Sequence, residues 1–361
     1  MYKERLKKLQ NLLKEESCDA LIVEDPINLY YLTGLHLSAG TLLATTQGSH
    51  LIVDSRYIEK CKKSSPFPVL LAENNATLTN LLSSSELNFV KELAFDSGNT
   101  TYADFLKLQK ETQKLNLRPL DNPVAKLRCI KDTSEIDLLR DAAKLGSEGF
   151  DFICTLLKEG ITEEEVAIEL EIFWRRRGGK KLGFDPIIAF GANSSMPHYS
   201  AGKELLKKGD PVLIDIGVNY EDYHSDMTRV VFFGEPNSKI LEIYDIVRKA
   251  QQAALALCRP NTRIGDLDDA ARKSIIQQGY GDQFGHNLGH GVGLEIHESP
   301  TLRNKPPHNE IPLQEGMVIT IEPGIYLPNI GGVRLEDTVV IQKDGHENLT
   351  NRSVEPMIIG S

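Results

Sequence analysis

The first third of the chain alternates between helical and strand-like spacings of hydrophobic residues. Leu6, Leu9 and Leu13 fall on one face of a predicted helix over residues 2–16. Further helices are predicted over 28–33, from 54 onward, and over 77–82 and 102–114, and strands over 20–23, 41–45, 50–53, 69–72 and 92–95. This alternation is typical of an α/β domain with a mixed sheet.

The rest of the chain separates helices from strands. A long helix is predicted from Ser134, and a capping box at Thr162 and Glu165 opens a second helix. Strands follow over 186–190, 212–218 and 226–233, then helices over 237–257 and 265–278, and strands over 318–322, 332–341 and 347–349. The pattern predicts an α+β domain, and residues 119–133 resemble a linker. We therefore expect domains at 1–122 and 123–361.

Charge and cysteine content narrow the class of protein. The 41 basic and 51 acidic side chains give a formal charge of −10, which argues against a protein whose partner is nucleic acid. The chain has no apolar run of about 18 residues, so no membrane span is expected. Its five cysteines form no CxxC pair, which indicates a reducing compartment and a cytoplasmic location.

Two acids interrupt neighbouring apolar strands. Asp215 lies in the run 211–217, and Asp226 begins the next strand. A buried carboxylate is costly unless a partner compensates its charge. With a turn centred between Tyr220 and Glu221, the two acids would be directly opposed, with Cβ atoms about 4.5–5.5 Å apart. The hairpin could then hold one cation between them.

The same construction recurs near the C-terminus. Glu322 and Glu336 would face each other across a turn centred at Asn329, and a glycine-rich segment with His290 lies between the two hairpins. Four carboxylates and one imidazole suit two divalent cations such as Mn²⁺, Co²⁺, Fe²⁺ or Zn²⁺. The alternative, a solvated hairpin face, would also expose apolar residues on the same faces.

Six motifs in order resemble one family. They lie at 213–217, 225–229, 289–293, 296–298, 321–324 and 333–338, and are similar to those of the Xaa-Pro peptidases, the aminopeptidases P and proline dipeptidases among the pita-bread metallopeptidases. Segments 28–34 and 54–57 resemble the creatinase-type domain of these enzymes. The resemblance implies a creatinase-type N-terminal α/β domain followed by a pita-bread catalytic domain.

The resemblance also implies roles for individual residues. The metal ligands would be Asp215, Asp226, His290, Glu322 and Glu336, with Asp226 and Glu336 bridging two ions, most often Mn²⁺, and a hydroxide between the ions attacking the peptide. Glu322 would also pass a proton to the leaving proline nitrogen. The expected catalytic groups besides Glu322 are His198, His297, Arg334 and Tyr326. A homodimer is expected, in which His36 reaches the partner's site.

One position departs from the family pattern. The archaeal-type proline dipeptidases carry an arginine four residues after the position of His297, where this chain has Thr301, and Arg303 is two residues further on. This departure favours an Xaa-Pro aminopeptidase acting on longer peptides. A proline dipeptidase and a non-catalytic pita-bread binding protein are the alternatives. His286 and His308 are interpreted as structural or surface residues.

Overall fold

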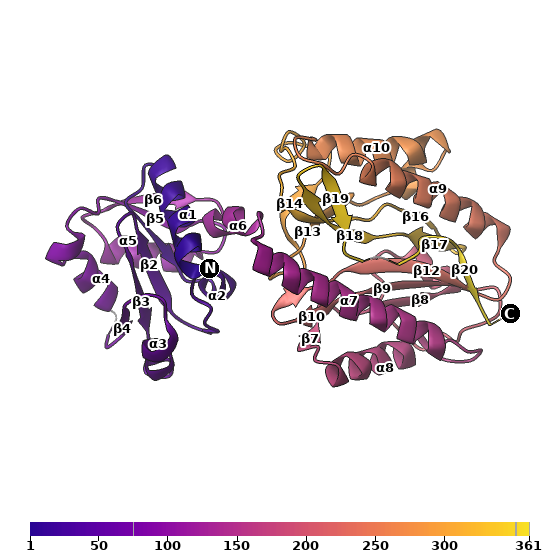
Figure 1. The fold of residues 1–361 in the computed structure, drawn as a ribbon, viewed down its shortest axis with the longest axis horizontal. Helices are drawn as coiled ribbons and strands as arrows, with labels where there is room; N and C mark the ends of the chain where they lie inside the picture. Colours follow the sequence, from indigo (N-terminus) through magenta and orange to yellow (C-terminus); the bar gives the residue numbers. More distant parts are fainter. Residues whose placement is uncertain (75, 351, 361) are drawn as a thin grey trace. The chain divides into compact units, whose positions relative to one another are not determined.

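The computed structural model describes residues 1–74, 76–350 and 352–360, which form two compact units, Met1–Arg128 and Cys129–Ser361. Figure 1 shows the course of the chain through both. In the described residues, no helix is both long and apolar enough to cross a membrane.

The first unit is built on a six-stranded mixed sheet in the order β4-β3-β2-β1-β5-β6. The strands are β1 (Ala20–Val23), β2 (Thr41–Thr45), β3 (Ser49–Val53), β4 (Val69–Leu71), β5 (Glu92–Asp96) and β6 (Asn116–Leu120). The helices are α1 (Tyr2–Glu15), α2 (Pro26–Thr33), α3 (Ile58–Ser64), α4 (Thr77–Leu82), α5 (Tyr102–Glu111) and α6 (Pro123–Arg128). The α/β character and the mixed sheet are as predicted.

The segment expected to be a linker contains regular structure. Strand β6 pairs in parallel with β5, and α6 packs against α1 and α2. The Nη1 atom of Arg128 donates a hydrogen bond to Asn28 Oδ1 at 3.0 Å, so the first unit extends to residue 128 rather than 122. An edge strand buries little, and it tolerates Pro119. Its sequence therefore resembles a linker.

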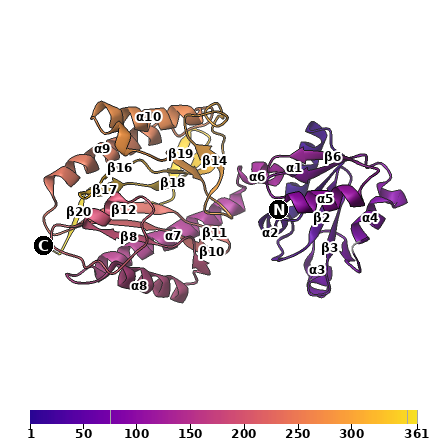
Figure 2. The ribbon, with the colours of Figure 1, turned by 180° about the vertical axis from the view of Figure 1, so that it is seen from behind.

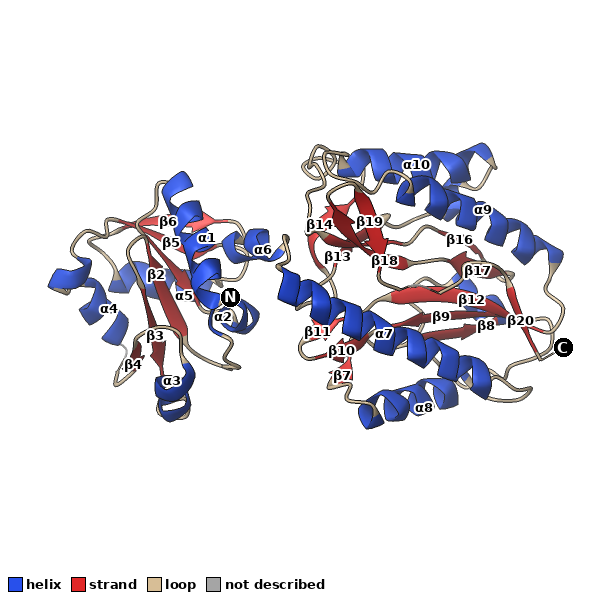
Figure 3. Ribbon diagram, in the orientation of Figure 1, coloured by secondary structure: helices blue, strands red, loops and turns tan. Residues whose placement is uncertain are grey.

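The second unit has helices on two sides of a set of sheets (Figures 1 and 3). The helices are α7 (Thr133–Leu156), α8 (Glu163–Arg176), α9 (Ser238–Leu255) and α10 (Ile264–Gln277). The strands are β7 (Lys181–Leu182), β8 (Ile187–Phe190), β9 (Pro211–Ile216), β10 (Val218–Tyr220), β11 (Tyr223–His224), β12 (Met227–Phe233), β13 (Gly289–Gly291), β14 (Glu298–Leu302), β15 (Val318–Ile321), β16 (Gly324–Leu327), β17 (Gly331–Arg334), β18 (Asp337–Gln342), β19 (Gly345–Asn348) and β20 (Met357–Ile359). Figure 2 shows the same layers from behind.

Strand β9 is buried on both faces, which explains its continuous apolar run. Val212 and Ile214 belong to the core beneath α7 and α8, whereas Leu213 belongs to the core beneath α9 and α10. Because side chains alternate along a strand, Asp215 points to the same inner face as Leu213. The acid therefore lies inside the α+β unit, as the sequence pattern indicated.

The register of the first hairpin differs from the prediction. Asp215 is paired with Thr228, not with Asp226, because the turn falls on Glu221 and Asp222. Both turn residues have positive φ, 45° and 74°, as a tight two-residue turn requires. The pairing is displaced by two residues, and an even displacement keeps a side chain on the same face. Asp226 thus still points inward.

The second hairpin has the predicted register. Gly324 pairs with Arg334 and Ile321 with Asp337, so both ladders are centred on Asn329, which has a φ of 64°. Glu322 lies between β15 and β16, and Glu336 lies between β17 and β18, so both acids are at the junction of the two ladders. The sequence predicted this arrangement because the turn residues and the two apolar runs agree on one centre.

The two hairpins join at the inner face. A backbone bridge links Thr228 to Glu336, whose N–H donates to the Thr228 carbonyl at 3.1 Å. Beside it, buried Arg229 donates to Asp337 Oδ1 at 2.5 Å, and Gln251 donates to the other carboxylate oxygen at 3.1 Å. These bonds fix the strands that carry the inward-facing acids.

Replacing Asp337 by alanine should strongly destabilise the second unit. Removing one partner of a buried ion pair leaves Arg229 uncompensated and costs about 3–5 kcal/mol. The only tryptophan, Trp174, is buried in this unit, so its fluorescence in a urea titration reports the unfolding. Asp266→Ala, which removes the exposed pair with Arg263, is the control and should change the midpoint little. Equal midpoints for the two variants would contradict the structural role of the buried pair.

Candidate metal centre

A cavity of about 540 Å³ opens in the second unit, over the inner face of the two hairpins. It is lined by Phe184, Asp185, Ile187, Pro197, His198, Tyr199, Ser200, Asp215, Asp226, His286, Asn287, Gly289, His290, His297, Thr301, Glu322, Arg334 and Glu336. All five expected ligands and His198, His297 and Arg334 are among these residues. Tyr326 lies behind the lining, and His36 belongs to the first unit.

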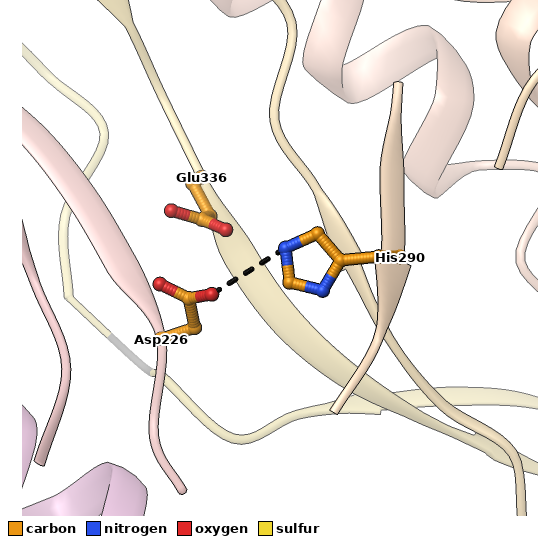
Figure 4. Close-up of side chains that lie close together, drawn as sticks. All are labelled: Asp226, His290 and Glu336. Carbon is orange, nitrogen blue, oxygen red and sulfur yellow. Dashed lines mark ion pairs between the residues drawn. The ribbon is translucent and has the colours of Figure 1, made fainter. Parts of the chain in front are cut away.

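Three of the expected ligands converge (Figure 4). One donor atom each from Asp226, His290 and Glu336 lies within 4.8 Å of the other two. The Nε2 atom of His290 is 3.5 Å from Asp226 Oδ2 and 3.4 Å from Glu322 Oε1. Residues from both hairpins and from β13 therefore surround a common point, which is an arrangement that could hold a cation.

His290 lies on β13, a strand that the sequence analysis did not predict because glycine is rare in strands. A Cβ atom on Gly289 would lie 2.1 Å from the Thr320 carbonyl oxygen, so only glycine allows β13 to approach β15 this closely. The His290 N–H donates to Thr320 Oγ1 at 3.0 Å, and its Nδ1 atom is 3.1 Å from the Gly291 carbonyl oxygen. Nε2 is left as the atom that faces the acids.

The acids carry more negative charge than the surrounding side chains compensate. Burial is the largest cause that raises the pKa of Asp226 and Glu336 well above the ordinary range, and the neighbouring carboxylates raise it further. Burial raises the pKa of Glu322 to about 8, and burial lowers the pKa of His290 to about 4. The Oδ1 atom of Asp215 is buried and has no hydrogen-bond partner among the residues that the structure describes. This set of oxygen donors and one neutral imidazole fits divalent cations.

Arg334 supports the site from behind. It donates from Nη2 to Asp215 Oδ2, from Nε to Thr228 Oγ1 at 3.1 Å, and from Nη1 to the Tyr326 hydroxyl at 2.7 Å. Thr228 in turn donates to Glu336 Oε2 at 2.7 Å. The guanidinium therefore orients one expected ligand directly and a second through Thr228.

His286 belongs to the site, although the sequence analysis interpreted it as structural or surface. It lines the cavity, and its Nε2 atom is 2.9 Å from the Tyr326 hydroxyl. Burial, reinforced by Arg334, lowers the pKa of His286 to about 4, so the ring is neutral at pH 7. In the sequence, the feature that could have indicated a site role for His286 is its position in the same glycine-rich segment as His290.

His198 and His297 border the cavity from two loops. The ring of His297 meets that of His290 edge-on, with centroids 4.2 Å apart, and burial lowers its pKa. The next residue, Glu298, forms a buried ion pair with Lys131 at 2.7 Å, which fixes the start of β14. His198 is exposed and follows the short helix Gly191–Ser195.

Chelator-treated protein should lose thermal stability as the pH rises from about 7.5 to 8.5. This range lies above the ordinary histidine pKa of about 6.5, so histidines of the unfolded chain are already mostly neutral, as the buried His286 and His290 are in the folded chain. The folded state holds the protons of the buried acids more tightly, so deprotonation favours unfolding. Added Mn²⁺ should raise the melting temperature, and by more at pH 8.5, where fewer protons compete.

Differential scanning calorimetry with and without Mn²⁺ measures both effects. Glu322→Gln removes one of the titrating groups and should flatten the pH dependence. A melting temperature that stays constant or rises over this range in chelator would contradict the charge assignment.

Comparison with known proteins assigns a family to each part of the chain. Residues 5–130 match the creatinase/prolidase N-terminal domain, and residues 137–343 match metallopeptidase family M24. The chain is 37% identical to the Xaa-Pro dipeptidase of Pyrococcus furiosus over 98% of this chain and 99% of that protein.

Two solved structures cover nearly the whole chain. An Xaa-Pro dipeptidase from Bacillus anthracis has a TM-score of 0.94 and 32% identity, and covers 99% of this chain and 100% of its own. An X-Pro aminopeptidase from Thermotoga maritima has a TM-score of 0.87 and 31% identity, with 97% and 100% covered. The chain belongs to metallopeptidase family M24 and carries the creatinase/prolidase N-terminal domain before its metallopeptidase domain.

Proposed function

We propose that this protein is a two-metal Xaa-Pro dipeptidase. The observation that carries the proposal is the convergence of four carboxylates and a neutral His290 on one cavity, bordered by His198 and His297. The names of the relatives in Pyrococcus furiosus and Bacillus anthracis support the dipeptide as substrate. The preference for longer peptides, which the sequence suggested, is revised accordingly.

Asp215, Asp226, His290, Glu322 and Glu336 would hold the two ions. Bound divalent cations polarise a carbonyl and lower the pKa of water. The oxygen-rich donor set suits Mn²⁺ best, with Co²⁺, Zn²⁺ and Fe²⁺ as alternatives. Metal analysis of the protein purified without added metal tests this order of metal preference.

The chain's own residues would handle the proton and the substrate. Glu322 takes the proton of the attacking water and delivers it to the proline nitrogen as the peptide bond breaks. His198 and His297 donate hydrogen bonds to the scissile carbonyl oxygen as it becomes tetrahedral. Arg334 and Tyr326 hold Asp215 and the ring of His286 in place.

An Xaa-Pro aminopeptidase is the second candidate, and Thr301 is the observation that favours it. Thr301 lines the cavity, and its hydroxyl cannot form an ion pair with the free carboxylate of a dipeptide. In a dipeptidase, a group other than Thr301 would have to bind that carboxylate. We also propose a homodimer in which His36, which stacks on Tyr30 with ring centroids 4.4 Å apart, reaches the partner's site.

A peptide panel should separate the two candidates. We expect Mn²⁺-loaded enzyme to hydrolyse Xaa-Pro dipeptides with a higher kcat/KM than the matching Xaa-Pro-Yaa tripeptides, and chelator to abolish both activities. Dipeptides with alanine in place of proline serve as the control substrates. Faster cleavage of the tripeptides would favour the aminopeptidase, and activity that survives chelation would exclude both.

Glu322→Gln should lower kcat by about 10²–10⁴-fold, because the amide cannot transfer the proton. The exposed Glu315→Gln variant changes charge equally and should retain wild-type kinetics. Metal content is measured in parallel, so that loss of an ion is distinguished from loss of proton transfer. Full activity of the Glu322 variant would contradict the assignment.

A further inference from the structure

A buried acid outside the metal centre holds the loop that carries His198. Glu163 is the first residue of α8 and is fully buried. Its Oε1 atom accepts hydrogen bonds from the Phe190 N–H at 2.8 Å and from Asn193 Nδ2 at 3.0 Å. Its Oε2 atom accepts from the Tyr199 hydroxyl at 2.7 Å and from the Gly202 N–H at 3.0 Å. All four donors are neutral.

The four donors are distributed along the loop, from residue 190 at its start to residue 202 at its end. Phe190 ends strand β8, Gly202 follows the loop, and Asn193 and Tyr199 lie between them. His198 is directly adjacent to Tyr199. The Asn193 amide also donates to the Tyr199 hydroxyl at 2.9 Å, which orients the phenol toward Glu163. One carboxylate therefore fixes both ends and the middle of the His198 loop.

The same loop is attached on its other side to the metal-bearing strands. Ser194, which is buried, accepts a hydrogen bond from the Gly332 N–H at 2.8 Å and donates to the Gly191 carbonyl at 2.6 Å. Gly332 lies on β17, two residues before Arg334. The loop thus joins α8 to the strand that supports Asp215, and its position relative to the metal centre is defined from both sides.

We propose that Glu163 is a positioning residue that acts through His198, setting the distance between this histidine and the scissile carbonyl. A carboxylate suits the task because its two oxygens accept four hydrogen bonds, whereas a glutamine amide would direct an NH₂ group at N–H donors. Burial and Glu163 raise the pKa of Tyr199 to about 12, so its hydroxyl remains a donor at pH 7. The kinetic part of the proposal rests on the proposed peptidase function.

Glu163→Gln tests the proposal in the full-length, Mn²⁺-loaded protein. We expect kcat/KM for an Xaa-Pro dipeptide to fall about 10–100-fold, as for other groups that orient a site residue, with unchanged metal content. The exposed neighbour Glu164→Gln is the matched control and should behave as wild type.

A double-mutant cycle with His198→Ala tests whether Glu163 affects activity through His198. If Glu163 acts through His198, the Glu163→Gln change should have little further effect in the His198→Ala background. An equal fold-loss in both backgrounds would overturn the proposal, since it would indicate a general structural effect. Asn193→Ala removes one of the four donors and provides a milder variant if Glu163→Gln does not fold.

Hydrogen exchange measured by mass spectrometry gives a readout that is independent of activity. Amides of residues 191–202 should exchange faster in Glu163→Gln than in Glu164→Gln, while the rest of the second unit is unchanged. If the wild-type protein hydrolyses no Xaa-Pro peptide, the proposed function fails, and this experiment still decides the role of Glu163 in holding the loop. Unchanged exchange in the loop would overturn that role.

Discussion

The cost of burying negative charge organises the second unit. Four carboxylates lie on the inner face of two hairpins, and the buried guanidinium of Arg334 contacts only one of them directly, Asp215. An uncompensated buried charge is expensive enough to prevent folding or to force protonation. The raised pKa values of Asp226, Glu322 and Glu336 correspond to protonation, the second of these outcomes. A bound divalent cation would compensate the negative charge and remove the need for protonation.

Other buried acids in the same unit have their negative charge compensated by hydrogen-bond donors or by a cationic side chain. Glu163 is satisfied entirely by neutral hydrogen-bond donors, and Glu298 and Asp337 each pair with a buried cation. Burial of an acid alone therefore does not indicate a metal. Where several carboxylates face one another, with an imidazole nitrogen directed at them, the chemistry of the donors suits a divalent cation.

The sequence predicted most of this arrangement because its local signals agreed. The second hairpin was placed correctly since Asn329 and the flanking apolar runs define a single centre. The first hairpin was displaced by two residues because the polar stretch near Tyr220 offered several turn positions, and only positive φ at Glu221 and Asp222 selects one. Strand β13 depends on tertiary contacts, such as the approach of Gly289 to Thr320, which no local pattern encodes. For His286 the sequence offered one weak local signal, the glycine-rich segment that it shares with His290. Edge strand β6 buries too little to give an apolar signal.

The bridge between Thr228 and Glu336 has a consequence for how the chain folds. The Thr228 hydroxyl donates a hydrogen bond to Glu336, which is 108 positions away in sequence, and the four expected carboxylate ligands divide between the two hairpins that this contact joins. Closing so long a loop is entropically costly, and contacts between residues far apart in sequence slow folding. Each hairpin can assemble locally with its acids still in water, where their charge costs little. The repulsion between the acids becomes costly when the hairpins meet and bury them, so a divalent cation bound at that stage would favour the joining of the two hairpins.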